Sequence, residues 1–576
     1  MRFEARTALY CPEYLHKHYA ESAFNLSKRL KEGDDPLADE YKRLGNLHEE
    51  KVLEKVRANG LRVHQIDLSE TYSSRSIQTA EALVRHDIDI ILGANIDQET
   101  EDHLAKLIDG YSKSDPDRIS RPDLLIRVGE NGHPMWAPVD VKSHGASAKN
   151  TTHTLERTNL DLTPADEPSI VGRFEKEDAL QLAHYSVHLQ NLGFAFTDAR
   201  AGIIGKDGEF IHWANLDQVL LGRGKAAPSA ILVYYEEFKR ATDLALKAIA
   251  KDKDHSIEVD SMAKITPGDY GCMRCEFKNV CLEEIEKYDN GNGHVTLLAR
   301  VTPAFQKMYF EDIDSIADLR IASGLSDKAD PAIVRARVWQ TGIPELINES
   351  EPLDIPEFDI EIDIDLENSQ AALFESFEEA LPGKDQVYLY GYGILDRTVS
   401  KDWRDAEFKS IINFDDTVEA EIEVLSSMWK VLQNEVAKAR AAGKTIGIFH
   451  YSPHERSWFK KFAKRHAAVA GVPSLPEVEA FMDEYFVDLI EYSKLVALKV
   501  TGYGIKKMAP LADFRWQVDD PGGALSLLKY REAINEKLTK EERDVHREWL
   551  RSYNIDDVKA TFAVREYLRK LASDGL

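Results

Sequence analysis

The stretch Phe358-Asp-Ile-Glu-Ile-Asp-Ile-Asp-Leu366 alternates acidic and apolar residues without interruption. Successive side chains of a β-strand point to opposite faces, so the pattern predicts a strand with one acidic face and one apolar face. Carboxylates in one row along a strand repel one another. A bound cation would relieve this repulsion, and so would open solvent, and the pattern by itself leaves both explanations open.

Further segments of the second half predict more of a sheet, and a helix that carries an acidic residue. Gln386–Leu395 and Thr445–Tyr451 are further predicted strands, and Glu455 follows the second of them. Near the end of the chain, Tyr553 and Asp557 are four residues apart on a predicted helix, so both side chains lie on one face. The second half therefore combines acidic residues from a strand with one from a helix.

Together these residues resemble the DEDD-type exonucleases of the RNase H-like fold, in the subclass that carries a tyrosine. The resemblance implies that Asp359 and Glu361 form the D-x-E strand of a two-metal site and that Tyr553 and Asp557 complete it. Glu455 stands where that family has an aspartate, and its carboxylate reaches one methylene further. This departure leaves two alternatives, a working second site or a relic that only binds nucleic acid.

In the first half, Arg121–Val128 and Trp136–Lys142 predict a hairpin. Asp140 and Lys142 share one face of the returning strand, and Asp123 on the paired strand can reach that face. Two carboxylates beside a lysine suit metal-dependent hydrolysis, because the carboxylates hold the ion and the lysine orients or helps deprotonate the attacking water. The alternative is an exposed hairpin with a salt bridge.

Two predicted helices flank this hairpin in the sequence. Gly45–Leu53 predicts an amphipathic helix with His48 near its start, where a histidine is more often a surface or capping residue. The helix that begins near Glu177 carries Gln181 and Tyr185 one turn apart on the same face. Their polar ends could steady a phosphate group or a water molecule.

The chain contains four cysteines, namely Cys11, Cys272, Cys275 and Cys281. A C-x2-C pair with a third cysteine at short spacing suits an iron–sulfur cluster or a Zn²⁺ ion, with the fourth thiolate supplied by the distant Cys11. Such a site would join the start and the end of one domain. Unrelated reduced thiols are the alternative, and the spacing cannot choose between iron and zinc.

In this order, the first-half residues resemble the RecB-like branch of the PD-(D/E)xK nucleases that carry an iron–sulfur cluster. The resemblance implies a Mg²⁺ or Mn²⁺ ion held by His48, Asp123, Asp140 and the carbonyl of Val141. It also implies that Lys142 is the catalytic lysine, assisted by Gln181 and Tyr185. By the same resemblance, a [4Fe–4S] cluster is preferred over zinc for the four cysteines.

The composition is that of a globular protein, with 43% hydrophobic and 30% charged residues. No apolar run approaches the length of a membrane span, and the N-terminus lacks an apolar signal core, so we expect a cytoplasmic protein without a membrane partner. The net charge of −27 argues at face value against nucleic-acid binding. Acidic metal ligands and basic clusters such as Lys460–His466 weaken that argument.

These observations predict an α/β protein with three regions. Residues 1–290 would form a PD-(D/E)xK restriction-endonuclease-like domain with the cluster, 291–350 a small helical connector, and 351–576 an RNase H-like domain of the DEDD exonuclease type. We expect a Mg²⁺- or Mn²⁺-dependent exonuclease that hydrolyses phosphodiester bonds in DNA repair, processing or defence. Expected partners are DNA that is single-stranded or has single-stranded ends, RNA as a second substrate, and helicase, repair or defence proteins. The rival hypothesis is a non-catalytic scaffold.

Overall fold

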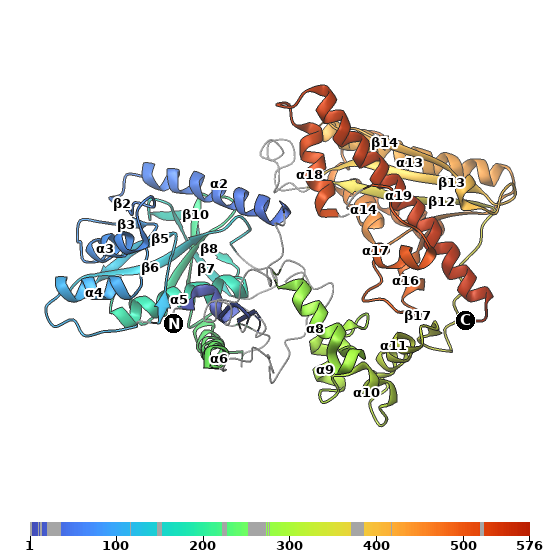
Figure 1. Cartoon of the computed structure of the whole chain (residues 1–576). Coiled ribbons are helices and arrows are strands. Elements are labelled where there is room, and N and C mark those ends of the chain that lie inside the picture. Colours follow the sequence, from blue (N-terminus) through green and yellow to red (C-terminus); the bar gives the residue numbers. More distant parts are fainter. Residues whose placement is uncertain are drawn as a thin grey trace. The chain divides into compact units, whose positions relative to one another are not determined.

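The structure is a computed structural model of the chain (Figure 1). It describes residues 3–9, 11, 14–15, 17–19, 36–115, 117–146, 153–219, 221, 227–250, 272, 275, 277–369, 385–415, 417–518 and 523–576. The chain divides into two compact units, of which the first consists mainly of Tyr41–Ala263 and the second mainly of Lys264–Leu576. This division lies before Cys272, Cys275 and Cys281, whereas we expected the first domain to extend to residue 290.

The first unit is built on an eight-stranded sheet in the order β2-β3-β5-β6-β9-β10-β7-β8. The strands of the unit are β1 (Phe3–Glu4), β2 (Val63–Gln65), β3 (Ile90–Leu92), β4 (Arg118–Ile119), β5 (Leu124–Glu130), β6 (Pro134–Val141), β7 (Thr154–Asn159), β8 (Pro164–Val171), β9 (Arg200–Ile204) and β10 (Phe210–Asn215). Its helices are η1 (Ala5–Leu9), α2 (Pro36–Ala58), α3 (Tyr72–Leu83), α4 (Gln98–Leu107), α5 (Lys176–Leu192) and α6 (Ala230–Ala250).

Two hydrophobic clusters place helices on both faces of this sheet. Val52, Leu53 and Val56 of α2 pack against β5, β6 and β10 in one cluster, which also includes Val139 of β6. Helices α5 and α6 form the other cluster with β9 and η1. Because side chains alternate along β6, the polar residue after Val139 faces α5 instead of α2. The predicted hairpin of β5 and β6 is present, with Leu124 opposite Val139.

The second unit begins with a helical region and continues into a five-stranded sheet. The helical region contains α8 (Lys278–Gly291), η2 (Val295–Leu297), α9 (Pro303–Tyr309), α10 (Ile316–Ile321), α11 (Asp330–Thr341) and the short strand β11 (Glu345–Leu346). β11 pairs antiparallel with β17 (Val496–Ala497), so the region is joined to the later part of the unit by backbone hydrogen bonds. The connector predicted for 291–350 is therefore helical and packs on the domain that follows it.

The five-stranded sheet has the order β14-β13-β12-β15-β16, with the predicted acidic strand at its centre. Its strands are β12 (Ile360–Asn368), β13 (Val387–Asp396), β14 (Glu407–Ile412), β15 (Ile446–His450) and β16 (Phe486–Asp488). β12 is antiparallel to β13 and parallel to β15. The helices of this part are η4 (Trp403–Asp405), α13 (Val418–Ala441), α14 (His454–Arg465), α15 (Leu475–Tyr485), α16 (Leu489–Ser493), α17 (Ile505–Met508), η5 (Ala509–Ala512), α18 (Gly523–Ile534) and α19 (Lys540–Ser573).

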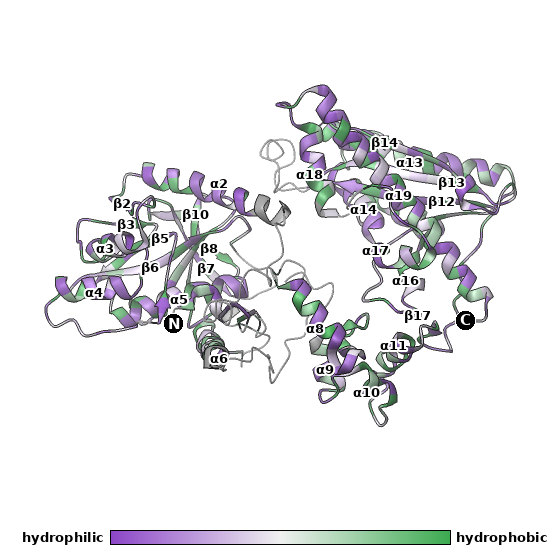
Figure 2. Cartoon of the chain, in the orientation of Figure 1, coloured by the Kyte–Doolittle hydropathy of each residue, from purple (hydrophilic) through white to green (hydrophobic). Residues whose placement is uncertain are grey.

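The two faces of β12 meet different helices. The aliphatic residues Ile362 and Ile364 pack with α13, α14 and α15 in the main core of the unit. The acidic face meets α19, a helix of 34 residues whose ribbon carries both hydrophilic and hydrophobic colours in Figure 2. Gly391 and Gly393 of β13 make this approach close, since a Cβ atom at Gly393 would lie 2.8 Å from a ring carbon of Phe562 on α19.

None of the helices among the described residues is both long enough and apolar enough to cross a membrane.

Candidate functional site

Three carboxylates converge between β12 and α19. Asp365 and Glu367 extend from the end of β12, and Asp557 extends from the middle of α19. One ligand oxygen from each of the three lies within 4.8 Å of the others. Among the described residues, no other group of three or more His, Cys, Asp or Glu side chains has potential ligand atoms this close together.

Burial and mutual repulsion act on all three carboxylates. Burial, followed by the charge of Asp557, raises the pKa of Asp365 well above its usual range and that of Glu367 to about 8. Burial also raises the pKa of Asp557, against the opposing effect of the Lys506 ammonium group. A buried group of acids in this state gains from a cation that neutralises it.

Lys506 is the cation that now contacts this group, through an ion pair with Asp557. Trp516 Nε1 also donates to Asp557 Oδ1 at 2.7 Å, and Asn554 Nδ2 donates to Asp365 Oδ2 at 2.7 Å. These donors orient two of the carboxylates, while one lysine cannot neutralise three of them. The donor set of three converging carboxylates, of which Asp557 is buried and Asp365 and Glu367 are half-buried, fits a hard divalent ion such as Mg²⁺ or Mn²⁺.

Glu455 lies at the start of α14 and is 3% exposed. Its charge adds to the repulsion on both Asp365 and Glu367, which places it beside the three carboxylates. Its Oε2 atom accepts no hydrogen bond from the described residues and lies 3.5 Å from His450 Nδ1. A buried carboxylate oxygen without a donor is available to a metal ion.

Tyr553 precedes Asp557 by one helical turn, as predicted, and is 3% exposed. Burial, together with the charge of Asp557, raises the pKa of its hydroxyl, so it stays protonated and can donate a hydrogen bond. The Lys506 ammonium group lies 4.4 Å from the centre of its ring, and Trp549 stacks on the ring at 5.2 Å. These contacts hold the ring in place beside the carboxylates.

The family model of the RNase H superfamily matches residues 376–569. The matched range contains Glu455, Tyr553 and Asp557 but begins after β12. The second unit contains an RNase H-like domain. No curated protein and no solved structure matches the chain. The expectation of an RNase H-like fold for the second half is thus confirmed, and a domain of this superfamily suggests a nuclease-type function.

The structure places the D-x-E pair that we expected in the RNase H-like domain apart from the three converging carboxylates. Asp359 lies before β12, is half-buried, and accepts hydrogen bonds from the backbone and hydroxyl of Thr445. Glu361 is fully buried among Arg397, Arg565 and Arg569. A strand rises about 3.3 Å per residue, so Glu361 stands roughly 13 Å from Asp365 along β12. The pair beside Asp557 is therefore Asp365–Glu367.

Both D-x-E pairs were present in the sequence, and the acidic alternation continues through Asp365-Leu366-Glu367. Glu367 was missed because strand periodicity places all these acids on one face without saying which end meets the helix. The signal that could have found it is the length of the alternation, which continues beyond Leu366.

The structure brings together most residues predicted for the first-unit site. Asp123 Oδ2 accepts from the backbone N–H of Val141 at 2.7 Å, and Lys142 Nζ donates to Asp140 Oδ2 at 3.1 Å. Lys142 Nζ also donates to Gln181 Oε1 at 2.9 Å. Gln181 Nε2 in turn donates to the hydroxyl of Tyr185 at 2.9 Å. The hairpin and α5 thus share one hydrogen-bonded chain.

The electrostatics of this site are dominated by burial and like charge. Burial, then the charges of Asp140 and Glu49, raise the pKa of Asp123 well above its usual range. Burial alone would lower the pKa of Lys142, but Asp140 and Asp178 outweigh it and raise that pKa, which keeps the lysine protonated. In this state Lys142 can donate a hydrogen bond, and it acts as a base only after losing a proton.

The contribution of α2 to this site differs from the one we expected. His48 Nε2 lies 3.2 Å from the carbonyl oxygen of Gly205, next to the end of β9. Its neighbour Glu49 is the α2 residue whose charge acts on Asp123 and Asp140. Sequence reasoning missed Glu49 because a glutamate on an amphipathic helix normally faces solvent.

The four cysteines belong to different units. Cys11 belongs to the first unit, whereas Cys272, Cys275 and Cys281 belong to the second. Locally, the backbone N–H of Cys275 donates to the carbonyl of Cys272 at 3.1 Å, and that of Cys281 donates to Phe277. The backbone N–H of Phe277 also donates to Cys275 Sγ at 3.5 Å. The iron–sulfur cluster stays a prediction from the sequence.

Proposed function

We propose that this protein is a metal-dependent nuclease whose RNase H-like domain hydrolyses phosphodiester bonds of DNA from an end of the strand. The observation that supports this is the group of Asp365, Glu367 and Asp557, joined by Glu455, in a domain of a nuclease superfamily. Four clustered acids beside one lysine, two of them buried (Glu455 and Asp557) and two half-buried (Asp365 and Glu367), cost free energy in a protein that has no cation to place there. A catalytic metal site explains that cost.

In this proposal, Asp365, Glu367, Glu455 and Asp557 would hold Mg²⁺ or Mn²⁺. The bound metal would supply a Lewis acid for the phosphoryl oxygens and lower the pKa of a water molecule. The chain itself orients the ligands, because Asn554 fixes Asp365 and Trp516 fixes Asp557. Tyr553 presents a protonated hydroxyl beside the carboxylates, where it can orient the attacking water.

We also propose a second catalytic centre in the first unit. It is supported by the contacts among Asp140, Lys142 and Gln181 and by the proximity of Asp123. There Asp123, Asp140, Glu49 and the Val141 carbonyl are candidate metal ligands, with His48 beside them, and Lys142 is the candidate catalytic lysine. This assignment follows the PD-(D/E)xK resemblance of the sequence, with Glu49 added. A structural [4Fe–4S] cluster and a cytoplasmic location complete the proposal as expectations from the sequence.

The test is a nuclease assay on the full chain with Mg²⁺ or Mn²⁺ and end-labelled DNA and RNA, single- and double-stranded. Four proteins are compared, namely the wild type, Glu367→Gln, Lys142→Ala and the double variant. Loss of cutting in Glu367→Gln alone assigns the activity to the RNase H-like domain, and loss in Lys142→Ala alone assigns it to the first unit. Residual cutting by each single variant and none by the double variant indicates two centres.

A matched control is Glu536→Gln, which removes a negative charge from an exposed residue after α18. This variant should cut as the wild type does. A wild type that binds DNA but cuts no substrate with either metal would contradict the nuclease proposal and favour the scaffold.

A further inference from the structure

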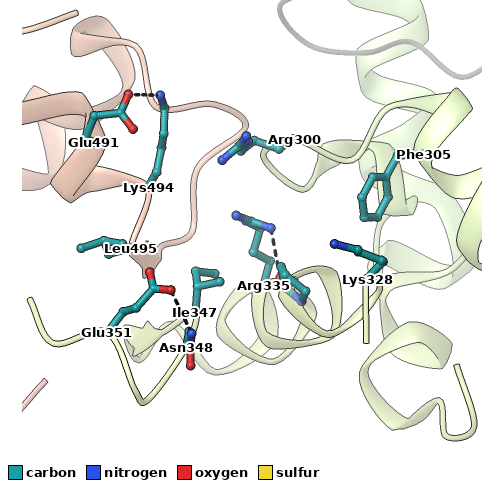
Figure 3. A pocket seen from close by; sticks show the side chains of 11 residues that line it. Arg300, Phe305, Lys328, Arg335, Ile347, Asn348, Glu351, Glu491, Lys494 and Leu495 are labelled. Carbon is teal, nitrogen blue, oxygen red and sulfur yellow. Dashed lines mark hydrogen bonds and ion pairs between the residues drawn. The ribbon is translucent and has the colours of Figure 1, made fainter. Parts of the chain in front are cut away.

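A cavity of about 440 Å³ lies between the helical region and the RNase H-like domain, within the second unit (Figure 3). Its walls come from α9, α11, the segment after β11, and the end of α16. Four of its lining residues are cations and two are carboxylates, which gives a net charge of +2; these are Arg300, Lys328, Arg335, Lys494, Glu351 and Glu491. The chain as a whole carries −27. A positive cavity in so acidic a protein is selective for anions.

Arg335 is the residue that sets this cavity apart from an ordinary surface. It is 5% exposed, and none of the described carboxylates lies within ion-pair distance of its guanidinium group. Its hydrogen bonds go to neutral oxygens, through Nε to the Tyr503 hydroxyl at 3.4 Å and through one terminal nitrogen to the Pro331 carbonyl at 3.1 Å. Buried charges are normally paired with an opposite charge. Arg335 therefore has the hydrogen-bonding capacity and the charge to bind an anion.

The acids of the cavity neutralise Lys494 but not Arg300 or Lys328. Glu491 forms its ion pair with Lys494 at 2.6 Å, and Glu351 accepts from Asn348 Nδ2 at 3.1 Å. Arg300 and Lys328 have no ion pair with any described residue, and Figure 3 shows both of them around the same hollow as Arg335. Two arginines and a lysine without acidic partners match the oxygens of a phosphate group.

Apart from Asn348, the remaining walls are apolar. Phe305 lines the cavity with a half-buried ring, and Ile347 and Leu495 add aliphatic surface. A cavity of this volume is within the range of small-molecule sites. An aromatic ring beside a cluster of cations matches a nucleotide, because the ring can stack on a base while the cations bind its phosphate.

We propose that this cavity binds the phosphate and base of one nucleotide. The nucleotide is either a free nucleoside monophosphate or the phosphorylated end of a strand. The strand-end form rests on the proposed nuclease function, whereas binding of the free nucleotide does not. Arg335 also contacts the segment that leads to the three converging carboxylates, since its partner Tyr503 precedes Lys506 by three residues.

The experiment measures binding by calorimetry on the full-length Glu367→Gln variant in EDTA, so that catalysis does not enter the result. The probes are adenosine monophosphate and adenosine. Charge-assisted hydrogen bonds to the phosphate raise the affinity by about tenfold or more. Adenosine, which lacks the phosphate, should therefore bind at least about tenfold more weakly than adenosine monophosphate. Equal binding of the two probes, or no binding of either, would overturn the proposal whatever the nuclease assay shows.

Substitutions of lining residues test whether the nucleotide binds in this cavity. Lys328→Ala removes an exposed cation of the cavity, and Arg335→Met removes the buried one. Each should weaken binding of adenosine monophosphate by about tenfold. Lys307→Ala is the matched control, because Lys307 is an exposed lysine on α9 that does not line the cavity. If Arg335→Met melts at a lower temperature than the Glu367→Gln protein that carries it, the affinity of Lys328→Ala determines whether the nucleotide binds in the cavity. Unchanged affinity in Lys328→Ala would place the ligand elsewhere.

Two further probes distinguish a free nucleotide from the phosphorylated end of a strand. A tetranucleotide with a 5′-phosphate is compared with the same tetranucleotide without it, again on Glu367→Gln in EDTA. Tighter binding of the phosphorylated tetranucleotide than of adenosine monophosphate, lost in Lys328→Ala, identifies a strand end. Equal or weaker binding identifies the free nucleotide.

Discussion

The two ends of strand β12 carry the same kinds of side chain and have opposite electrostatic environments. At the first end, Glu361 and Asp363 are fully buried and paired with arginines, of which Arg565 contacts both. At the other end, Asp365, Glu367 and Asp557 lie close together, and the one lysine beside them, Lys506, forms its ion pair with Asp557. One end is neutralised by the protein and the other is left with excess negative charge.

The pKa values of the two glutamates express this difference, whereas at the first end burial outweighs Arg565 and raises the pKa of Asp363 to about 7. Burial alone would raise the pKa of Glu361, but Arg565 and Arg569 outweigh it and lower that pKa to about 2. For Glu367, burial and the charge of Asp557 act in the same direction and raise the pKa to about 8. An acidic row on a strand is therefore weak evidence for a metal site until the helix that covers it is known.

The largest effect is expected at the unneutralised end. Glu367→Gln and Asp557→Asn should each lower nuclease activity of the RNase H-like domain by about 100-fold or more, because electrostatic stabilisation at the reacting phosphate is lost. Both variants should melt at a higher temperature than the wild type in EDTA, since each removes a repelling charge. Activity is measured in the Lys142→Ala background. A variant that keeps full activity there would contradict the assignment of that residue.

Glu361→Gln should have the opposite effect, on stability. The folded-state pKa of Glu361 lies about 2.5 below its ordinary value of 4.5, which corresponds to about 3 kcal/mol of unfolding free energy. Because the folded pKa is depressed, this contribution is present above pH 4.5 and is lost as the pH falls towards 2. Urea unfolding of wild type and variant at several pH values measures it.

The control for this prediction is Asp359→Asn, whose carboxylate is only half-buried and should contribute little. A Glu361→Gln protein that unfolds at the same urea concentration as the wild type but no longer binds Mn²⁺ would return Glu361 to the metal site.

Substitutions of Glu455 test whether it is a fourth metal ligand beside Asp365, Glu367 and Asp557. Glu455→Gln keeps the shape of the side chain and removes its charge, and we expect the Mn²⁺ concentration for half-maximal activity to rise by about tenfold. Glu455→Asp should show a smaller increase or none. An unchanged Mn²⁺ requirement in Glu455→Gln would leave three ligands, Asp365, Glu367 and Asp557.

The smallest effect is expected for Lys506, the lysine of the unneutralised end. Lys506→Met removes a positive charge that competes with the metal ion for Asp557. Metal binding should become more favourable by about 1 kcal/mol, so the Mg²⁺ concentration required for activity should fall by about fivefold. The same variant should melt at a lower temperature in EDTA and recover when Mg²⁺ is added. A higher Mg²⁺ requirement would mean that Lys506 orients Asp557 for the metal.

Much of both sites follows from the sequence. The alternation over Phe358–Leu366 predicted the acidic strand and its faces, and the spacing of Tyr553 and Asp557 predicted a shared helical face. The hairpin that carries Asp123, Asp140 and Lys142 was also predicted. These features depend on backbone periodicity over a few residues, which the local sequence determines.

The tertiary structure alone decided which acids of β12 meet Asp557. A strand repeats every two residues, so Glu361 and Asp365 are equivalent in the sequence, and the choice is made by α19, whose Asn554 contacts Asp365 across a separation of 189 residues. The same holds for Glu49, which reaches the first-unit site only because α2 packs on that sheet. It also holds for the cavity around Arg335, whose walls come from segments that only folding brings together. Periodicity orients side chains within an element, whereas packing between elements determines which charges are paired.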